Sequence, residues 1–190
     1  GKETADMIPI RDCIRSRTYP YVNVTILVVT LVVWVWQASM SERELARMVY
    51  IYGAVPAQIT RSFFGGDYVS ALVPLITSVF LHGGWVHVLG NMLYLWVFGD
   101  NVEDRLGHTR YLIFYLAAGI IGGLAQVFSN PGSMTPVVGA SGAIAGILGA
   151  YVISFPRARI ETLLILIFYI TIVRIPALVF IFFCLLYTSD

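Results

Sequence analysis

Charged side chains are scarce in this sequence. Asp, Glu, Lys and Arg together make up 12% of the 190 residues, whereas an ordinary soluble domain holds about a quarter. The formal net charge is only +1 and no basic run alternates with aromatic residues, so the composition argues against a nucleic-acid partner. Hydrophobic residues reach 58% and the mean hydropathy is +0.79, which predicts a membrane protein in one small helical bundle.

Cysteine and histidine are rare as well. Cys13 and Cys184 lie in distant contexts without metal-ligand spacing, so we expect neither a disulfide framework nor a metal centre, and no cofactor. The sequence holds three histidines, His82, His87 and His108. Two of them fall inside an apolar run, where a polar side chain is costly.

Long apolar runs, by contrast, are frequent. Four of them approach the roughly 20 residues that an α-helix needs to cross a bilayer, and we expect four complete spans in an all-α bundle. The four runs cover residues 22–38, 74–99, 111–128 and 141–155. The first lacks a clear cleavage site, so a retained anchor is favoured over a cleaved signal peptide. We expect a charged connection outside the hydrocarbon at 100–110 and a turn-rich loop at 129–138.

Two further segments are less regular. Residues 39–73 mix charged with aromatic positions, which favours an amphipathic insertion at the membrane interface over a plain loop. Residues 160–187 are apolar but are interrupted by Arg174 and Pro176. Because an arginine at membrane depth is costly, we expect residues 160–173 partly at the interface and an incomplete fifth span beginning near Pro176.

The basic residues predict the orientation. Eight lie on one set of connections and three on the other, and the positive-inside rule puts the larger set in the cytoplasm. The larger set is Lys2, Arg11, Arg15, Arg17, Arg105, Arg110, Arg157 and Arg159, and the smaller set is Arg43, Arg47 and Arg61. We therefore expect residues 1–20 to be a cytoplasmic N-terminal segment of a multi-pass chain.

One serine lies among residues with almost no side chain. Ser141 follows Gly139 and precedes Gly142 at the start of the fourth run, where glycines permit a sharp turn and bare presentation of the hydroxyl. Such a serine suits a nucleophile. The alternative interpretation is packing, because small residues one turn apart let membrane helices approach closely.

Polar side chains also interrupt the second run. His87 and Asn91 are four residues apart, so on a helix they project from one face, one turn apart. Groups of this kind at membrane depth mark a cavity-lining site, although an interhelical hydrogen bond explains either residue alone equally well. The predicted orientation puts His87 and Ser141 near the same, outer, membrane face.

These two stretches resemble the rhomboid intramembrane serine proteases. The residues from His82 to Gly99, with His87, Gly90 and Asn91, are similar to the second helix of bacterial rhomboids. The stretch Gly-Ala-Ser-Gly-Ala-Ile-Ala-Gly at 139–146 is similar to the fourth helix, which carries the nucleophile. The resemblance runs from about residue 7 to 183. It implies six helices around a water-filled cavity in a bacterial inner membrane, and cleavage of transmembrane substrates by a serine-histidine dyad.

The resemblance also implies roles for single residues. Ser141 would be the nucleophile, and His87 and Asn91, with the Ser141 backbone amide, would stabilise the oxyanion, supported by Gly139 and Gly142. The family's general base is a histidine on the sixth helix, which none of the three histidines here matches. We therefore expect a C-terminally truncated, inactive chain with an incomplete membrane domain at 21–183.

Residues 184–190 do not resemble the family but are similar to one frame of a transposon-end sequencing adaptor, so we expect a non-native tail. The alternative is a natural fifth helix that ends in a short polar tail.

The rival functional class is non-catalytic: a rhomboid-like protein that binds transmembrane clients, or a small transporter subunit. The glycines beside Ser141 argue against both. The expected partners are a transmembrane substrate and the lipid bilayer.

Overall fold

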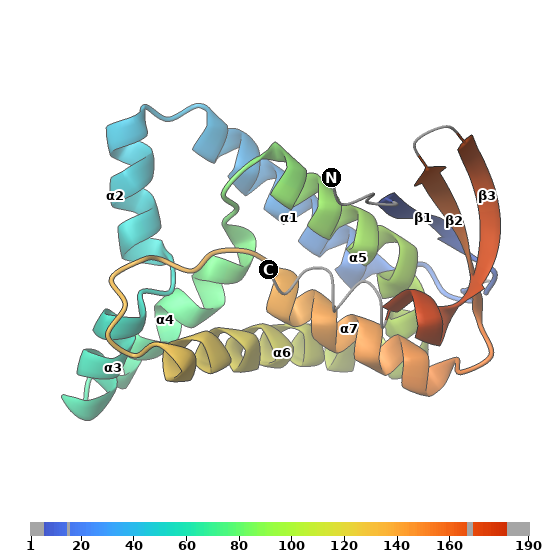
Figure 1. Ribbon diagram of the computed structural model, residues 1–190. Helices are drawn as coiled ribbons and strands as arrows, with labels where there is room; N and C mark the ends of the chain where they lie inside the picture. Colours follow the sequence, from blue (N-terminus) through green and yellow to red (C-terminus); the bar gives the residue numbers. More distant parts are fainter. Residues whose placement is uncertain (1–5, 15, 167–168, 182–190) are drawn as a thin grey trace.

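The computed structural model describes residues 6–14, 16–166 and 169–181, and it shows a mostly helical chain with one small sheet (Figure 1). The helices are α1 (Tyr21–Ala38), α2 (Glu42–Tyr52), α3 (Pro56–Phe64), α4 (Tyr68–Thr77), the 3-10 helix η1 (Ser78–Phe80), α5 (Trp85–Leu106), α6 (His108–Ser129) and α7 (Ser141–Ser154). The strands are β1 (Asp6–Asp12), β2 (Arg159–Leu166) and β3 (Tyr169–Pro176).

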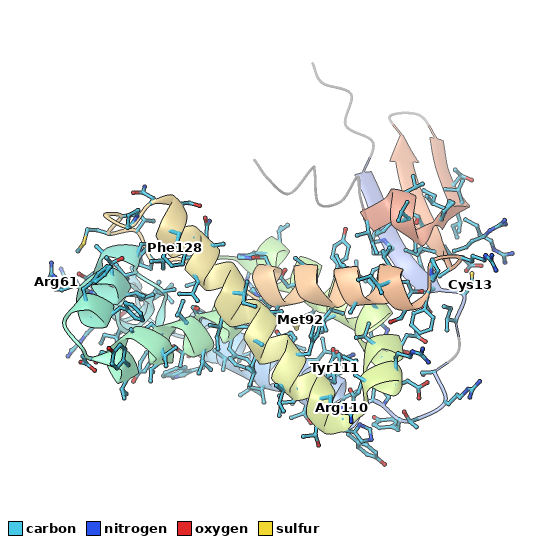
Figure 2. The ribbon with its side chains drawn as sticks, turned by 90° about the horizontal axis from the view of Figure 1, so that it is seen from below. Cys13, Arg61, Met92, Arg110, Tyr111 and Phe128 are labelled. Atoms are coloured by element: carbon cyan, nitrogen blue, oxygen red, sulfur yellow. The ribbon has the colours of Figure 1, made fainter. Side chains whose placement is uncertain are left out.

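The long helices form the body of the molecule, and smaller elements lie at its two ends. α7 packs against α5 and α6, and α1 packs against α5. α2 and α3 lie at one end and the sheet at the other (Figure 1). Figure 2 shows the same separation, with Arg61 of α3 and Cys13 beside the sheet at opposite ends. Which of these ends faces the cytoplasm stays a prediction.

Two helices in the described part of the chain, α1 and α6, are long and apolar enough to cross a membrane. A third span exists if α4 with η1 and α5, which are bent by 86° at a short break, count as one broken span. α7 has 14 residues and a length of about 21 Å, short of the roughly 30 Å hydrocarbon core. The first and third predicted spans are confirmed as helices, whereas the count of four complete spans is not confirmed.

The charged stretch at 100–110 is not a connection, contrary to the prediction. α5 continues through it, and a single glycine separates α5 from α6. The reason is Glu103, which is fully buried and accepts the backbone N–H groups of Val22 at 3.0 Å and Asn23 at 2.7 Å. These N–H groups at the start of α1 have no partner within their helix, and a carboxylate there also meets the positive end of the helix dipole.

Glycines set the distance between α6 and its neighbours. A Cβ on Gly122 would lie 2.7 Å from the Cα of Gly142, so α6 and α7 touch through their backbones. On the same helix, a Cβ on Gly119 would meet Val79 of η1 and Ala143 of α7, and one on Gly123 would meet Leu75 of α4. Gly142 therefore has a packing role between helices, which was the alternative interpretation of the small residues around Ser141.

The three-stranded sheet corrects the all-helical prediction. β1 pairs antiparallel with β2, and β2 pairs antiparallel with β3. In β2, Ile160 and Thr162 are buried while their neighbours are more exposed, which is the two-residue period of a strand. β-Branched residues are frequent in both β2 and β3 and favour this conformation.

The sheet also accounts for Arg174, which the sequence analysis treated as a break. Its side chain pairs with Glu161 of the neighbouring strand, with Nη2 and Oε1 separated by 3.0 Å. The chain is helical again from residue 177 to 181, next to the predicted start of the fifth span. The predicted boundary between residues 183 and 184 lies outside the described residues.

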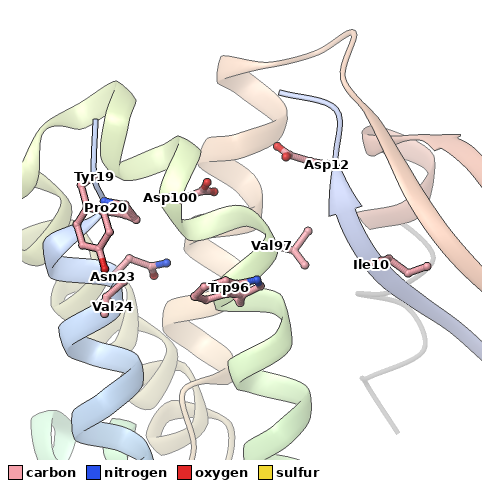
Figure 3. A pocket seen from close by; sticks show the side chains of 9 residues that line it. All are labelled: Ile10, Asp12, Tyr19, Pro20, Asn23, Val24, Trp96, Val97 and Asp100. Carbon is pink, nitrogen blue, oxygen red and sulfur yellow. The ribbon is translucent and has the colours of Figure 1, made fainter. Parts of the chain in front are cut away.

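Asp12 joins the sheet to two helices. Its Oδ2 accepts hydrogen bonds of 2.7 Å from the hydroxyl of Tyr151 on α7 and of 2.7 Å from the amide of Asn101 on α5. Asp12 also lines a cavity of about 260 Å³, in which Figure 3 shows its carboxyl group and that of Asp100 above Trp96. Burial raises the pKa of Asp12 to about 6, and the nearby charge of Asp100 adds to this effect.

We predict that stability falls as pH rises from about 4 to about 6. The folded state holds the proton of Asp12 more tightly than the unfolded state does, so deprotonation in this window favours unfolding. Because the carboxyl group is partly exposed, we expect a loss of only about 1 kcal/mol. Thermal midpoints in detergent between pH 4 and 8 measure it, and Asp12→Asn is expected to flatten this part of the profile. An unchanged profile in Asp12→Asn would contradict the assignment.

Candidate active site

Ser141 is the first residue of α7, and the loop before it is held from two directions. Ala54 and Val137 exchange backbone hydrogen bonds of 3.0 and 2.9 Å, which tie the loop to the junction of α2 and α3. The N–H of Gly139 donates to the carbonyl of Ser78 at 2.9 Å. The position of the serine therefore depends on α2, α3 and η1 as well as on its own helix.

Gly139 brings this loop against α5. Its φ is +123°, a conformation that a residue with a side chain rarely adopts. A Cβ at Gly139 would lie 2.6 Å from both Cε1 and Nε2 of His87 and 3.7 Å from Nδ2 of Asn91. Two side chains of α5 thus reach the backbone two residues before Ser141.

Asn91 is oriented by a residue that the sequence analysis left outside the site. Its Nδ2 lies 2.9 Å from Nε2 of His82, and Nδ1 of His82 lies 3.3 Å from the carbonyl of Phe80. A carbonyl only accepts, so Nδ1 carries the ring proton and Nε2 accepts from the Asn91 amide. The amide of Asn91 has two hydrogens, and one stays available for another acceptor.

His82 is in turn held by α1. Gln37 accepts the backbone N–H of His82 at 3.1 Å and donates to its carbonyl at 3.2 Å. Both residues are almost fully buried, so this pair satisfies the backbone at the break between η1 and α5. The sequence analysis missed Gln37, although a polar side chain inside an apolar span was the signal for it.

The hydroxyl of Ser141 faces open space. Ser141 is exposed and lines a cavity of about 300 Å³ whose wall includes Gly119 and Gly122 of α6. Its hydroxyl forms no hydrogen bond with any residue that the structure describes. A molecule that enters this cavity can therefore reach the serine hydroxyl without displacing a protein hydrogen-bond partner.

The third histidine lies elsewhere. His108 begins α6, and its Nδ1 contacts the carboxylate of Glu103. α6 has 22 residues and is about 33 Å long, and the loop to Ser141 follows its other end, at Ser129. The structure therefore brings Gly139 together with His87 and Asn91, two residues before Ser141, while His108 lies at the opposite end of α6 from Ser129. Whether Ser141 acts with His87 and Asn91 stays a prediction.

Comparison with known proteins connects this arrangement to a family. A family model described as the Rhomboid domain matches residues 69–189, more than half of the chain. Rhomboid protease GluP of Bacillus subtilis (strain 168) is 47% identical over 76 residues, which are 40% of this chain and 14% of that protein. Rhomboid protein 1, mitochondrial, of Saccharomyces cerevisiae is 35% identical over 98 residues, 50% of this chain and 28% of that protein.

A third relative covers more of the chain. Presenilin-associated rhomboid-like protein A, mitochondrial, of Danio rerio is 29% identical over 138 residues, 72% of this chain and 33% of that protein. The chain belongs to the rhomboid family, whose proteases are serine proteases, and it is an integral membrane protein. It spans a third or less of the length of these three relatives.

We predict that Gly139→Ala destabilises the fold by about 2 kcal/mol or more, because the new Cβ meets the His87 ring and the backbone conformation is strained. Gly149→Ala is the matched control, since nothing lies within 4 Å of a Cβ there. Thermal unfolding in detergent measures the difference. Equal midpoints for the two variants would show that Gly139 does not approach His87 as closely as described.

Proposed function

We propose that this chain belongs to an intramembrane serine endopeptidase that cleaves transmembrane segments of other membrane proteins near the outer leaflet, and that it carries the nucleophile of that enzyme. Ser141 is the nucleophile and attacks the carbonyl carbon of the scissile peptide bond. The observation that supports the proposal is the close approach of Gly139 to His87 and Asn91, because it places two side chains of α5 beside the loop two residues before the exposed Ser141. The names of relatives such as Rhomboid protease GluP support the same reaction class.

The two α5 residues stabilise the oxyanion in this proposal. Attack on the carbonyl develops negative charge on its oxygen, and fixed donors in a site of low dielectric constant stabilise that charge. The second amide hydrogen of Asn91 and a ring N–H of His87 are suitable donors, and the backbone N–H of Ser141, at the start of α7, is a third. His82 and Gln37 act through Asn91 by holding its amide in one orientation.

The proton of Ser141 needs an acceptor, and we assign this role to none of the three histidines of the sequence. His82 uses both ring nitrogens, one toward Phe80 and one toward Asn91. His87 serves the oxyanion, and His108 pairs with Glu103. A weak nucleophile without a base within about 3 Å reacts slowly.

Labelling with a serine-directed fluorophosphonate probe tests the function in membranes of cells that express the full-length protein. We expect labelling that disappears in Ser141→Ala and persists in Ser154→Ala, which changes a serine at the other end of α7. Labelling that survives Ser141→Ala, or no labelling at all, would favour the non-catalytic alternative, a rhomboid-like protein that binds transmembrane clients. We further propose that the protein lies in a bacterial inner membrane with its N-terminus in the cytoplasm. Fractionation of the same cells tests the membrane location.

We predict that His87→Ala or Asn91→Ala in the full-length protein lowers kcat by about a hundredfold with little change in KM. These residues contact the oxyanion, whose charge exists only in the transition state. Cleavage of a fluorogenic transmembrane substrate measures both constants. A double variant that cleaves at the original rate would remove both residues from the oxyanion site.

We predict further that the 190-residue polypeptide alone does not cleave peptides at a rate attributable to Ser141. The comparison is a version extended by a family-like helix that carries a histidine, reconstituted with the same fluorogenic substrate. Activity in the 190-residue form that Ser141→Ala abolishes would show that one of its own groups accepts the serine proton.

A further inference from the structure

A basic cleft lies at the sheet end of the molecule, away from Ser141. It has a volume of about 1000 Å³ and brings together Arg157, Arg159 and Arg174, which come from the α7–β2 connection, β2 and β3. Cys13 and Ile14 of the N-terminal segment complete one side of the cleft. Figure 2 shows Cys13 at this end, beside the sheet.

The charges of this cleft are only partly balanced by its neighbours. Arg174 pairs with Glu161 through two hydrogen bonds of 3.1 and 3.0 Å to one carboxylate oxygen. Arg157 and Arg159 are exposed and form no ion pair with a residue in the described parts of the chain. Two guanidinium groups therefore remain for an anion, and their planar donors match phosphate oxygens.

The rest of the cleft is apolar, which narrows the class of anion. Ile14, Phe155, Pro156 and Ala158 line it beside the arginines, and Ile14 and Phe155 pack against the hydrophobic core. The volume lies at the upper end of the roughly 300–1,000 Å³ typical of pockets for drug-sized ligands, far more than one phosphate ion fills. A ligand that combines a phosphate with a hydrophobic part fits both features.

The position of the cleft decides the source of such a ligand. It begins where α7 ends, at Phe155, so it lies where an apolar helix reaches the polar boundary of the bilayer. Arginines at the end of a membrane helix are often simply solvated. Here, however, Arg157 and Arg159 share an apolar wall with Arg174, which lies 15 residues further along the chain on the neighbouring strand. Basic pockets of this kind bind anionic lipid headgroups.

We propose that this cleft binds the headgroup of an anionic phospholipid from the adjacent leaflet. Arg157 and Arg159 bind the phosphate, and the apolar wall contacts the start of the acyl chains. The lipid would then bridge the end of α7 and the sheet, two elements that are also joined through Asp12. This site is independent of the proposed proteolytic activity and requires no cleavage for its detection.

Native mass spectrometry of the detergent-purified 190-residue chain tests the proposal with phosphatidylglycerol and with phosphatidylcholine. We expect retention of phosphatidylglycerol only, weakened by about twenty-fold in Arg157→Gln/Arg159→Gln, because each arginine near an anionic surface contributes about fivefold. The matched control is Arg43→Gln/Arg47→Gln, which removes the same charge from exposed positions of α2 at the other end of the molecule. We expect less than about twofold loss there.

Three outcomes would overturn the proposal. They are equal retention of phosphatidylcholine, an equal loss in the α2 control, and displacement of the lipid by inorganic phosphate at matched ionic strength, which would indicate a site for a free anion. If the double variant does not fold, Arg157→Gln alone replaces it. That residue lies in an exposed connection, and a loss of less than about twofold in the single variant would likewise contradict lipid binding.

Discussion

The contact between Gly139 and the His87 ring is the constraint on which the site depends. A backbone that approaches an imidazole this closely leaves no room for a side chain, and its φ of +123° is tolerated by glycine alone without strain. The contact joins the loop before α7 to α5, two segments separated by about fifty residues of chain. It adds to the packing of α7 against α5 and holds the loop before Ser141 against the polar face of α5.

The elements around this contact explain why it is rigid. One side is a relay of hydrogen bonds from Gln37 of α1 through His82 to Asn91 of α5. The other side is the loop itself, held by Ala54 and by Ser78, with Gly142 packed against Gly122 below it. A site for charge stabilisation needs donors whose position does not change during the reaction, and such a frame supplies this.

The sequence singles out candidate site residues, but parts of the fold could not be predicted from it. Ser141 was singled out because glycines flank it at the start of an apolar run. His87 and Asn91 were singled out because polar side chains are costly in apolar runs and because these two share a helix face. The roles of all three residues stay predictions. His82 lies in a break between helices, where hydrophobic periodicity gives no information. Gln37 could be noticed as a polar side chain inside an apolar run, but its partner, the backbone of His82, could not be predicted from the sequence. The sheet was missed because the sequences of β2 and β3 are as apolar as those of membrane helices. In addition, β1, which pairs with β2, is about 150 residues away in the chain. The buried end of α5 was missed because Glu103 looks solvent-exposed until its helix-capping role is known.

The most direct test of the proposed oxyanion site is a structure of the full-length protein with a phosphonate inhibitor bound covalently to Ser141. The phosphonyl oxygen then stands in for the oxyanion of the transition state. The account predicts that this oxygen lies about 2.7–3.1 Å from a ring nitrogen of His87, from Nδ2 of Asn91 and from the backbone nitrogen of Ser141. An oxygen that points away from α5, or a His87 ring that has left Gly139, would contradict it.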